Sequence, residues 1–258
     1  MTELNKRIIT AIVLVIVVWG WYFHLGSPWF ERALALFGWL TSCELILLLK
    51  LRQPWLYMCT AFFTWLAFSF HADIQWLLLT AFIWFACFVY QARQQAPEFD
   101  HFFSGIWMLA WLFAFCLAIA DTHLSNTGQG LIIGTCLAIW TSDIAAYFVG
   151  RACGKRKLCP AISPGKSVEG AIGGLVFAVP VAVGCWLYWD VLPLLPAILL
   201  AIIAVIAGML GDLSESAVKR LIGAKDSGRW LPGHGGILDR SDAMLMAVPV
   251  TWLLWGLI

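Results

Sequence analysis

The chain has 258 residues, of which 62% are hydrophobic and 12% charged, with a formal net charge of +1. Its mean hydropathy of +0.85 is typical of an integral membrane protein. The polar stretches are too short to fold as a separate soluble domain, and no nucleic-acid partner is expected. The eight scattered cysteines match no zinc pattern and are expected to remain free thiols.

Apolar runs predict an all-α, polytopic membrane protein with about nine transmembrane helices, because one span needs about 20 mostly apolar residues. The predicted spans are 8–24, 30–49, 54–70, 74–91, 103–120, 129–150, 168–189, 193–213 and 243–258. The first run could be a signal peptide, but bulky residues follow it, which favours an uncleaved helix. Residues 1–120 are expected to form five N-terminal helices, and residues 121–258 a C-terminal catalytic region.

The distribution of Lys and Arg predicts the orientation of these spans. If the N-terminus is cytoplasmic and nine spans alternate, 15 of the 16 Lys and Arg residues fall on the cytoplasmic side and only Arg32 falls opposite. We therefore expect an N-in, C-out topology, with loops 151–167 and 214–242 facing the cytoplasm.

One carboxylate, Asp143, falls inside the predicted span 129–150. An acid in the membrane either serves function or forms a hydrogen bond that stabilises the bundle, and the cost of the charge favours function. Arg151 lies about two helical turns further along, on roughly the same face, so a path from Asp143 to the basic loop is plausible.

The loop 151–167 gathers five cations beside the membrane, namely Arg151, Lys155, Arg156, Lys157 and Lys166. They could be a topology signal that touches anionic lipid headgroups, or a site for phosphate. Residues 165–167 read Gly-Lys-Ser, like the end of a P-loop, but Pro160 stands in place of that motif's first glycine and no strand is expected before it. We therefore reject a P-loop and expect Ser167 to cap the following helix.

The richest polar stretch runs from Gly211 to Asp242 and holds five acidic and five basic residues in 32 positions. Asp212, Glu215 and Lys219 are spaced to share one helix face, and the helix is expected to stop at Gly223.

Asp239 and Asp242 are again three residues apart, at the start of the last helix. Asp239 could instead be a simple N-cap. Carboxylates that leave one helix and enter the next can converge on one divalent cation, and oxygen ligands suit Mg²⁺ or Mn²⁺. The Lys and Arg residues between them would then face a polyphosphate.

Glu44 and two pairs of glycines could serve either the site or the packing of the helices. Glu44, in the second span, could line the same cavity or satisfy a polar contact in the bundle, and the sequence does not decide between them. The pairs Gly130/Gly134 and Gly170/Gly174 have the spacing of small residues that let helices pack closely.

Residues 216–242 resemble the signature of the phosphatidate cytidylyltransferases (CDP-diacylglycerol synthases), which runs S-x2-K-R-x4-K-D-x4-[LI]-P-G-H-G-G-x2-D-R-x-D. Every fixed position of that pattern is met. Residues 142–151 (SDIAAYFVGR) resemble the family's D-x2-A-Y-x2-G-[RK] segment, and residues 163–170 (SPGKSVEG) resemble S-P-x-K-T-x-E-G. Ser167 replaces the usual Thr, and Val168 stands where an aromatic is common.

The resemblance implies transfer of CMP from CTP to phosphatidate, giving CDP-diacylglycerol and pyrophosphate. It implies Mg²⁺, with or without a second cation, and a homodimer, and it matches Asp212 and Asp239 to the family's metal-binding aspartates. With Asp242 these form the expected metal set. The residues expected in catalysis are Asp143, Asp212, Lys219, Arg220, Lys225, Asp226, His234, Asp239, Arg240 and Asp242. Those expected to bind substrate or phosphate are Arg151, Ser163, Lys166, Ser167, Glu169, Ser216, Gly235 and Gly236.

The expected location is a bacterial inner membrane, with the active site facing the cytoplasm. A cytidylyltransferase for another lipid or polyprenyl phosphate remains an alternative. A CDP-alcohol phosphotransferase is disfavoured because that family's D-G-x2-A-R-x8-G-x3-D-x3-D pattern is absent. An ion-coupled transporter is disfavoured because the acids gather at one surface beside basic loops, and no repeat is evident.

Overall fold

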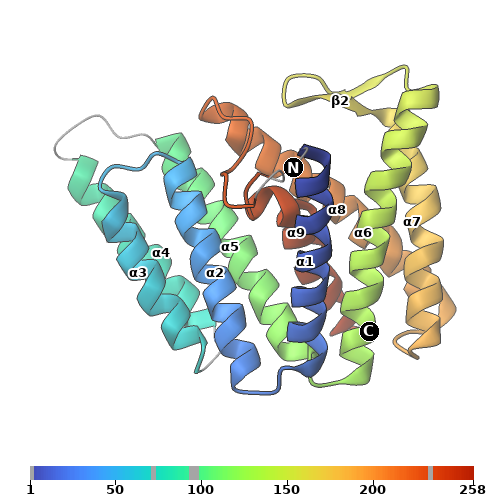
Figure 1. Cartoon of the computed structure of the whole chain (residues 1–258), viewed down its shortest axis with the longest axis horizontal. Coiled ribbons are helices and arrows are strands. Elements are labelled where there is room, and N and C mark those ends of the chain that lie inside the picture. The colour runs from blue at the N-terminus through green and yellow to red at the C-terminus, as the bar shows by residue number, and fades with distance from the viewer. Residues whose placement is uncertain (1–2, 71–73, 93–98, 232–234) are drawn as a thin grey trace. The chain divides into compact units, whose positions relative to one another are not determined.

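The computed structural model describes residues 3–70, 74–92, 99–231 and 235–258 (Figure 1). These described residues form nine α-helices, which confirms the all-α class, and one two-stranded hairpin. The helices are α1 (Glu3–His24), α2 (Trp29–Leu48), α3 (Pro54–Phe68), α4 (Ile74–Ala92), α5 (Phe99–Thr122), α6 (Asn126–Cys153), α7 (Val168–Tyr188), α8 (Leu194–Leu221) and α9 (Leu238–Trp255). The strands are β1 (Lys157–Cys159) and β2 (Ser163–Ser167).

Within the described residues, four helices are long and apolar enough to cross a membrane, namely α5, α6, α7 and α8. Shorter apolar helical stretches cover Ile12–His24 and Leu78–Val89. The chain is therefore a membrane protein, while the count of about nine spans and their N-in, C-out orientation stay predictions.

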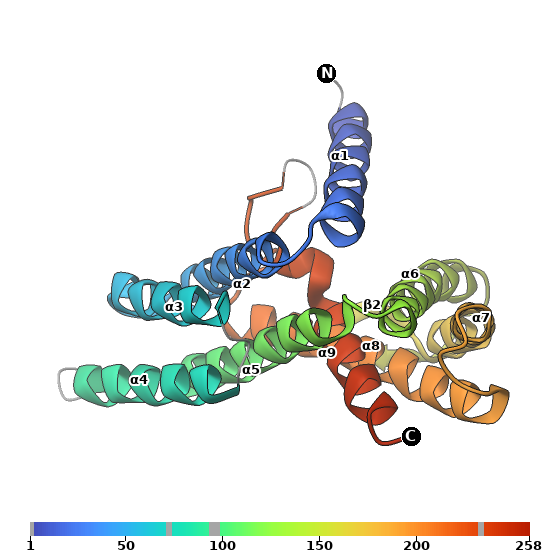
Figure 2. The same ribbon diagram turned by 90° about the horizontal axis from the view of Figure 1, so that it is seen from below.

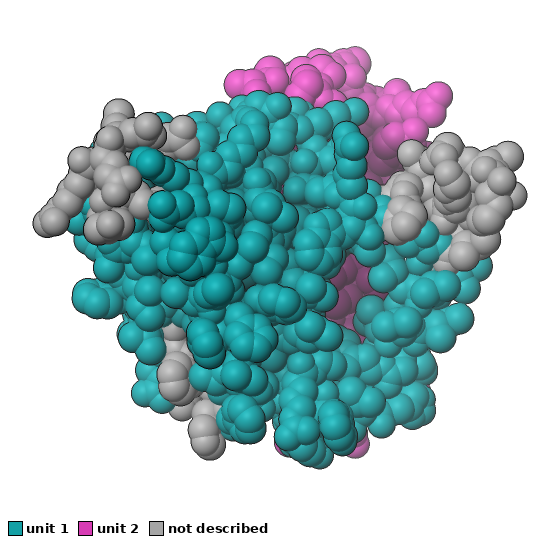
Figure 3. Space-filling view, turned by 60° about the vertical axis from the view of Figure 1, so that its left-hand side comes forward, with its two compact units in different colours: residues 1–120, 218–240 teal, residues 121–217, 241–258 magenta. Residues whose placement is uncertain are grey.

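The chain divides into two compact units, coloured separately in Figure 3. Unit 1 comprises residues 1–120 and 218–240, and unit 2 comprises residues 121–217 and 241–258. The signature segment is thus divided between the units, with most of it in unit 1.

Unit 1 packs its helices through buried aromatic side chains. Helices α2 and α3 lie side by side (Figure 2). Trp65 of α3 is 1% exposed, and its indole Nε1 donates a hydrogen bond to Ser42 Oγ of α2 at 2.9 Å. Gly38 leaves room for that ring, because a Cβ there would lie 2.5 Å from it. Trp84 of α4 donates in the same way to Thr60 Oγ1 of α3 at 2.9 Å.

Unit 2 instead packs α6 against α7 through glycine (Figure 2). A Cβ added at Gly134 would lie 2.4 Å from Trp186 Nε1, and one at Gly174 would lie 2.8 Å from Ser142 Oγ. These distances are shorter than van der Waals contact, so the helices can approach this closely only because the side chains are absent. The expected role of these glycines in close packing is confirmed.

The hairpin β1–β2 was not expected from the sequence, which predicted an irregular loop over 151–167. Its strands pair in antiparallel fashion, and the N–H of Ile162 closes the turn on the Cys159 carbonyl at 3.2 Å. The expectation that no strand precedes residues 165–167 is therefore wrong. These residues nevertheless lie in β2 itself rather than in a loop between strand and helix, so the rejection of a P-loop stands.

The expected cap of α7 is confirmed, since Ser167 Oγ accepts a hydrogen bond from the N–H of Gly170 at 3.1 Å. All eight cysteines lie in described residues and are free thiols, as expected.

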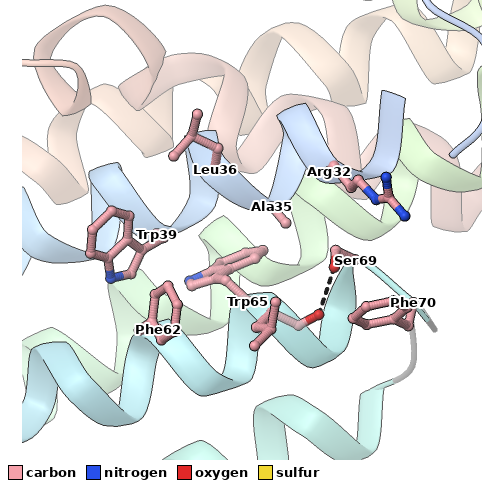
Figure 4. Close-up of a pocket in the computed structure, with 9 residues that line it drawn as sticks. Arg32, Ala35, Leu36, Trp39, Phe62, Trp65, Ser69 and Phe70 are labelled. Carbon is pink, nitrogen blue, oxygen red and sulfur yellow. Dashed lines mark hydrogen bonds between the residues drawn. The ribbon is translucent and has the colours of Figure 1, made fainter. Parts of the chain in front are cut away.

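A pocket of about 250 Å³ lies in unit 1 between α2 and α3, with Arg32 and Ser69 near one end (Figure 4). Its other lining residues are Ala35, Leu36, Trp39, Phe62, Trp65, Leu66 and Phe70. None of them is a predicted site residue.

Candidate functional site

In unit 2, a lysine from the hairpin meets an aspartate of α8. Lys166 Nζ on β2 forms an ion pair with Asp212 Oδ2, and Ser216 Oγ lies 3.4 Å from Asp212 Oδ1. The charges of Asp212 and Lys166 also act on Asp143 of α6. Unit 2 thus brings together residues from three separate stretches that were each predicted to belong to the site.

The last two helices approach each other closely within unit 2. A Cβ added at Gly211 of α8 would lie 2.6 Å from the carbonyl oxygen of Asp242 on α9. The Asp242 carboxylate itself accepts a hydrogen bond from the N–H of Ala243 at 2.8 Å. The start of α9 therefore lies against α8 beside Asp212, while convergence of the carboxylates on one cation stays a prediction.

In unit 1, Asp239 is held by one cation and two backbone groups. Lys219 Nζ lies 2.7 Å from Asp239 Oδ1, and these side chains are only 12% and 9% exposed. Asp239 Oδ2 accepts hydrogen bonds from the N–H groups of Ser227 and Gly236, each at 2.9 Å. Burial alone would raise the pKa of Asp239, but the hydrogen bonds from Lys219, Gly236 and Ser227 lower it below its usual value. The side chain is therefore a carboxylate anion, and its bonds to residues before α9 are not those of a simple N-cap.

Lys219 reaches Asp239 from the last turn of α8. That helix ends at Leu221, and Gly223, the expected stop residue, follows it with a φ of +68°. The N–H of Ala224 donates to the Lys219 carbonyl at 2.8 Å, and the N–H of Gly223 donates to the Arg220 carbonyl at 3.1 Å. This pair of bonds is a Schellman motif, which favours glycine at the left-handed position.

Glu44 of α2, for which the sequence left two roles open, lies in unit 1. It packs against the residues that join α8 to α9, described at 222–231 and 235–237 and called here the signature loop. Its side chain is 1% exposed, and it accepts a hydrogen bond from the hydroxyl of Ser227. It also accepts from the N–H of Ile237 at 2.8 Å and from that of Leu238 at 3.2 Å. Glu44 therefore satisfies polar groups at both ends of the loop.

The two glycines before α9 let the loop fold onto these acids. Gly235 has a φ of +84°, and a Cβ there would lie 2.7 Å from Asp239 Oδ2. A Cβ at Gly236 would lie 2.0 Å from Glu44 Oε1 and 2.1 Å from Ser227 Oγ. The N–H of Gly236 is donated to Asp239, so the predicted contact of this glycine with phosphate stays a prediction.

Two further predicted residues have local partners. Glu169 accepts hydrogen bonds from the N–H groups of Lys155 and Arg156 at 3.0 and 3.1 Å, so its carboxylate ties the basic loop to α7. Arg151 Nη1 donates to Tyr147 Oη at 3.3 Å, on an exposed face of α6. A link from Arg151 to Asp143 stays a prediction.

The remaining predicted residues divide by position. Lys225, Asp226, Arg220 and Arg240 are exposed, and Ser163 is half-buried in β2. His234, with Pro232 and Gly233 of the signature, lies outside the described residues.

Magnesium is implied by the resemblance, and the donor set fits it. Asp212 and Asp239 supply the carboxylate oxygens that Mg²⁺ prefers, and each already faces a lysine ammonium, so positive charge is accommodated at both. Among the described residues, no group of three or more His, Cys, Asp or Glu side chains is gathered as metal ligands. A metal shared by Asp212, Asp239 and Asp242 thus stays a prediction.

Ser227 contacts both Glu44 and Asp239 but was not predicted to belong to the site. It occupies a variable position of the signature, so only its place between two fixed acidic positions, Asp226 and Asp239, could have drawn attention to it.

A family model described as "Cytidylyltransferase family" matches residues 5–258. The chain is similar to a phosphatidate cytidylyltransferase of Pseudomonas aeruginosa, at 37% identity over 265 residues that cover 98% of this chain and 97% of the relative. It is 34% identical to a phosphatidate cytidylyltransferase of Haemophilus influenzae over 279 residues, covering 95% and 96% of the two chains. The match to one of Bacillus subtilis reaches 46% identity but spans 136 residues, about half of each chain (52% and 51%).

Proposed function

Because the chain belongs to the phosphatidate cytidylyltransferase family, we propose that it transfers CMP from CTP to phosphatidate, giving CDP-diacylglycerol and pyrophosphate. The observation that carries this proposal is the near-full-length similarity to two phosphatidate cytidylyltransferases.

The proposed reaction is a direct displacement at phosphorus. An oxygen of the phosphatidate phosphate attacks the α-phosphorus of CTP, a new P–O–P bond forms, and the bond to the β-phosphate breaks as pyrophosphate leaves with the electron pair. A phosphate monoester is already a nucleophile at neutral pH, so no covalent enzyme intermediate is needed. His234, if it acts, would donate a hydrogen bond to phosphate rather than serve as the base.

Both reactants are anions, so their repulsion is a large part of the barrier. We assign the neutralising role to the cations of the two cytoplasmic loops, Lys166, Lys219, Arg220, Lys225 and Arg240. Lys166 and Lys219 are each fixed by an aspartate, which holds their charge in one position. The other three are exposed and can follow a flexible triphosphate.

We propose that Mg²⁺ is held by Asp212 and Asp239, with Asp242 beside them, and that it supplies Lewis-acid stabilisation of triphosphate charge. The protein side of this arrangement is a pair of anionic carboxylates, each with its own lysine partner. If Mg²⁺ were held there, the ammonium groups of Lys166 and Lys219 would be placed to bind phosphate oxygens beside it.

We place this site at the cytoplasmic face of a bacterial inner membrane, with the acyl chains of phosphatidate remaining in lipid near Asp143. The strong bias of Lys and Arg toward one side supports this orientation. A homodimer, implied by the resemblance, is part of the same proposal.

The test is an assay of purified chain in detergent with CTP, Mg²⁺ and phosphatidate, followed by pyrophosphate release and formation of CDP-diacylglycerol. A parallel reaction with a polyprenyl phosphate addresses the alternative acceptor. Turnover with phosphatidate supports the proposal, whereas turnover only with the polyprenyl phosphate would replace it.

A further inference from the structure

Glu44 is a buried carboxylate whose three hydrogen-bond donors are uncharged groups of the signature region. Burial of a charge is costly unless hydrogen bonds compensate it, and Glu44 receives them from Ser227 Oγ, Ile237 N and Leu238 N. These donors lie 183 or more positions away in the sequence. The contacts are therefore a specific tie between α2 and the loop.

The hydrogen bonds between Glu44 and the loop lie next to Asp239 and share Ser227 with it. Ser227, whose hydroxyl binds Glu44, donates its own N–H to Asp239 Oδ2, and its hydroxyl lies 3.3 Å from the N–H of Asp239. Ile237 and Leu238, which also bind Glu44, immediately precede Asp239. Glu44 thus binds Ser227, which is one of the residues that hold the Asp239 carboxylate, and also binds the two residues that join Gly236 to Asp239.

Glu44 also suits the start of α9 electrostatically. The helix begins at Leu238, and the first N–H groups of a helix lack partners within it. A carboxylate there satisfies two of these groups and favours the positive end of the helix dipole.

We propose that Glu44 is a positioning residue for catalysis, which sets the conformation of Ser227 and of residues 236–239 and thereby the orientation of the Asp239 carboxylate. The effect of Glu44 on turnover rests on the proposed function. The effect of Glu44 on the conformation of the loop does not rest on it, so the two effects can be tested by separate experiments.

The first measurement is hydrogen–deuterium exchange on the full chain in detergent, without substrate. Glu44→Gln keeps the size of the side chain but removes its charge and one acceptor oxygen. We expect faster exchange in peptides containing residues 227 and 236–239, with unchanged exchange in α6 and α7. Glu31→Gln is the matched control, because Glu31 is the other acid of α2 and should leave exchange in these peptides as in the wild type.

The second measurement is the Mg²⁺ concentration that gives half-maximal pyrophosphate release. We expect Glu44→Gln to raise it, or to lower kcat, by about 10- to 100-fold, the range found when a group that orients a metal ligand is lost. A purely structural role would lower the unfolding temperature but leave the half-maximal Mg²⁺ concentration of the folded enzyme unchanged.

Ser227→Ala provides a second variant if Glu44→Gln does not fold, and it should change exchange and Mg²⁺ dependence in the same direction. Unchanged exchange at 236–239 in both variants, or changed exchange with unchanged Mg²⁺ dependence and kcat, would overturn the proposal. If the wild type releases no pyrophosphate, the proposed function fails, while the exchange data still test the role of Glu44.

Discussion

The two candidate metal-binding aspartates have different surroundings, although each has a lysine partner. Asp212 meets Lys166 with both side chains more than a quarter exposed, and it also accepts a hydrogen bond from Ser216 Oγ at 3.4 Å. Asp239 meets Lys219 in a buried setting and accepts two backbone N–H groups as well. The difference indicates that the Asp239 carboxylate is held firmly in the first turn of α9, whereas Asp212 can change partner more easily.

The largest effect that sharpens this comparison is on turnover. We expect Asp239→Asn and Asp212→Asn each to lower pyrophosphate release by about 100-fold or more, because both would lose the charge proposed to hold Mg²⁺. The measurement is kcat at saturating CTP and Mg²⁺, with folding checked by size-exclusion elution.

Lys6→Ala, at the far N-terminal end of the chain, is the control and should keep wild-type turnover. Full activity in Asp239→Asn would defeat the assignment of this residue to the metal.

A similarly strong effect is expected from filling the space beneath the loop. Gly236→Ala would place a Cβ 2.0 Å from Glu44 Oε1 and 2.1 Å from Ser227 Oγ, so the Glu44 and Ser227 side chains must shift and their hydrogen bond is disturbed. We expect turnover to fall by about 10- to 100-fold, through loss of the Asp239 geometry.

Gly20→Ala in α1 is the control, since a Cβ there meets nothing within 4 Å. If Gly236→Ala retained full turnover, the close contact of loop and Glu44 would be unimportant for the reaction.

The next prediction compares how much each of the two ion pairs contributes to the unfolding free energy. Lys219→Met leaves a buried carboxylate without its cation and should cost about 3 kcal/mol of unfolding free energy. Lys166→Met removes a more exposed pair and should cost about 1 kcal/mol or less. Thermal unfolding of the two variants, side by side in one detergent, checks the order, and a reversed order would contradict the difference described for the two aspartates.

The smallest effect concerns the packing that supports the Asp212 region. Gly134→Ala should lower the unfolding free energy by about 2 kcal/mol, because its Cβ would overlap the Trp186 indole. Gly184 lies in α7, and a Cβ added there would meet nothing within 4 Å. Gly184→Ala should therefore leave the unfolding free energy unchanged or raise it slightly. Equal unfolding temperatures for the two variants would show that α6 and α7 are not held at the described distance.

Much of this architecture could be predicted from local patterns. Apolar runs predicted the helices, and residue types with specific backbone roles predicted the Ser167 cap and the stop at Gly223. These features depend on residues that are close together in the sequence, so one sequence is enough to predict them.

The tie between Glu44 and Ser227 could not be predicted, because it joins residues 183 positions apart and depends on how helices assemble. The hairpin β1–β2 was missed for a different reason. Its strands are short and contain charged residues and proline, so they lack the alternating apolar pattern that indicates a strand.

The central claim is that this chain joins CTP to phosphatidate with the help of two aspartate–lysine pairs. Its most direct test is incorporation of radiolabelled CTP into lipid by purified wild-type, Asp212→Asn and Asp239→Asn proteins, each with and without added phosphatidate. The account predicts labelled CDP-diacylglycerol only from the wild type, only with phosphatidate and Mg²⁺. Labelled lipid from both variants at the wild-type rate, or none from the wild type, would contradict it.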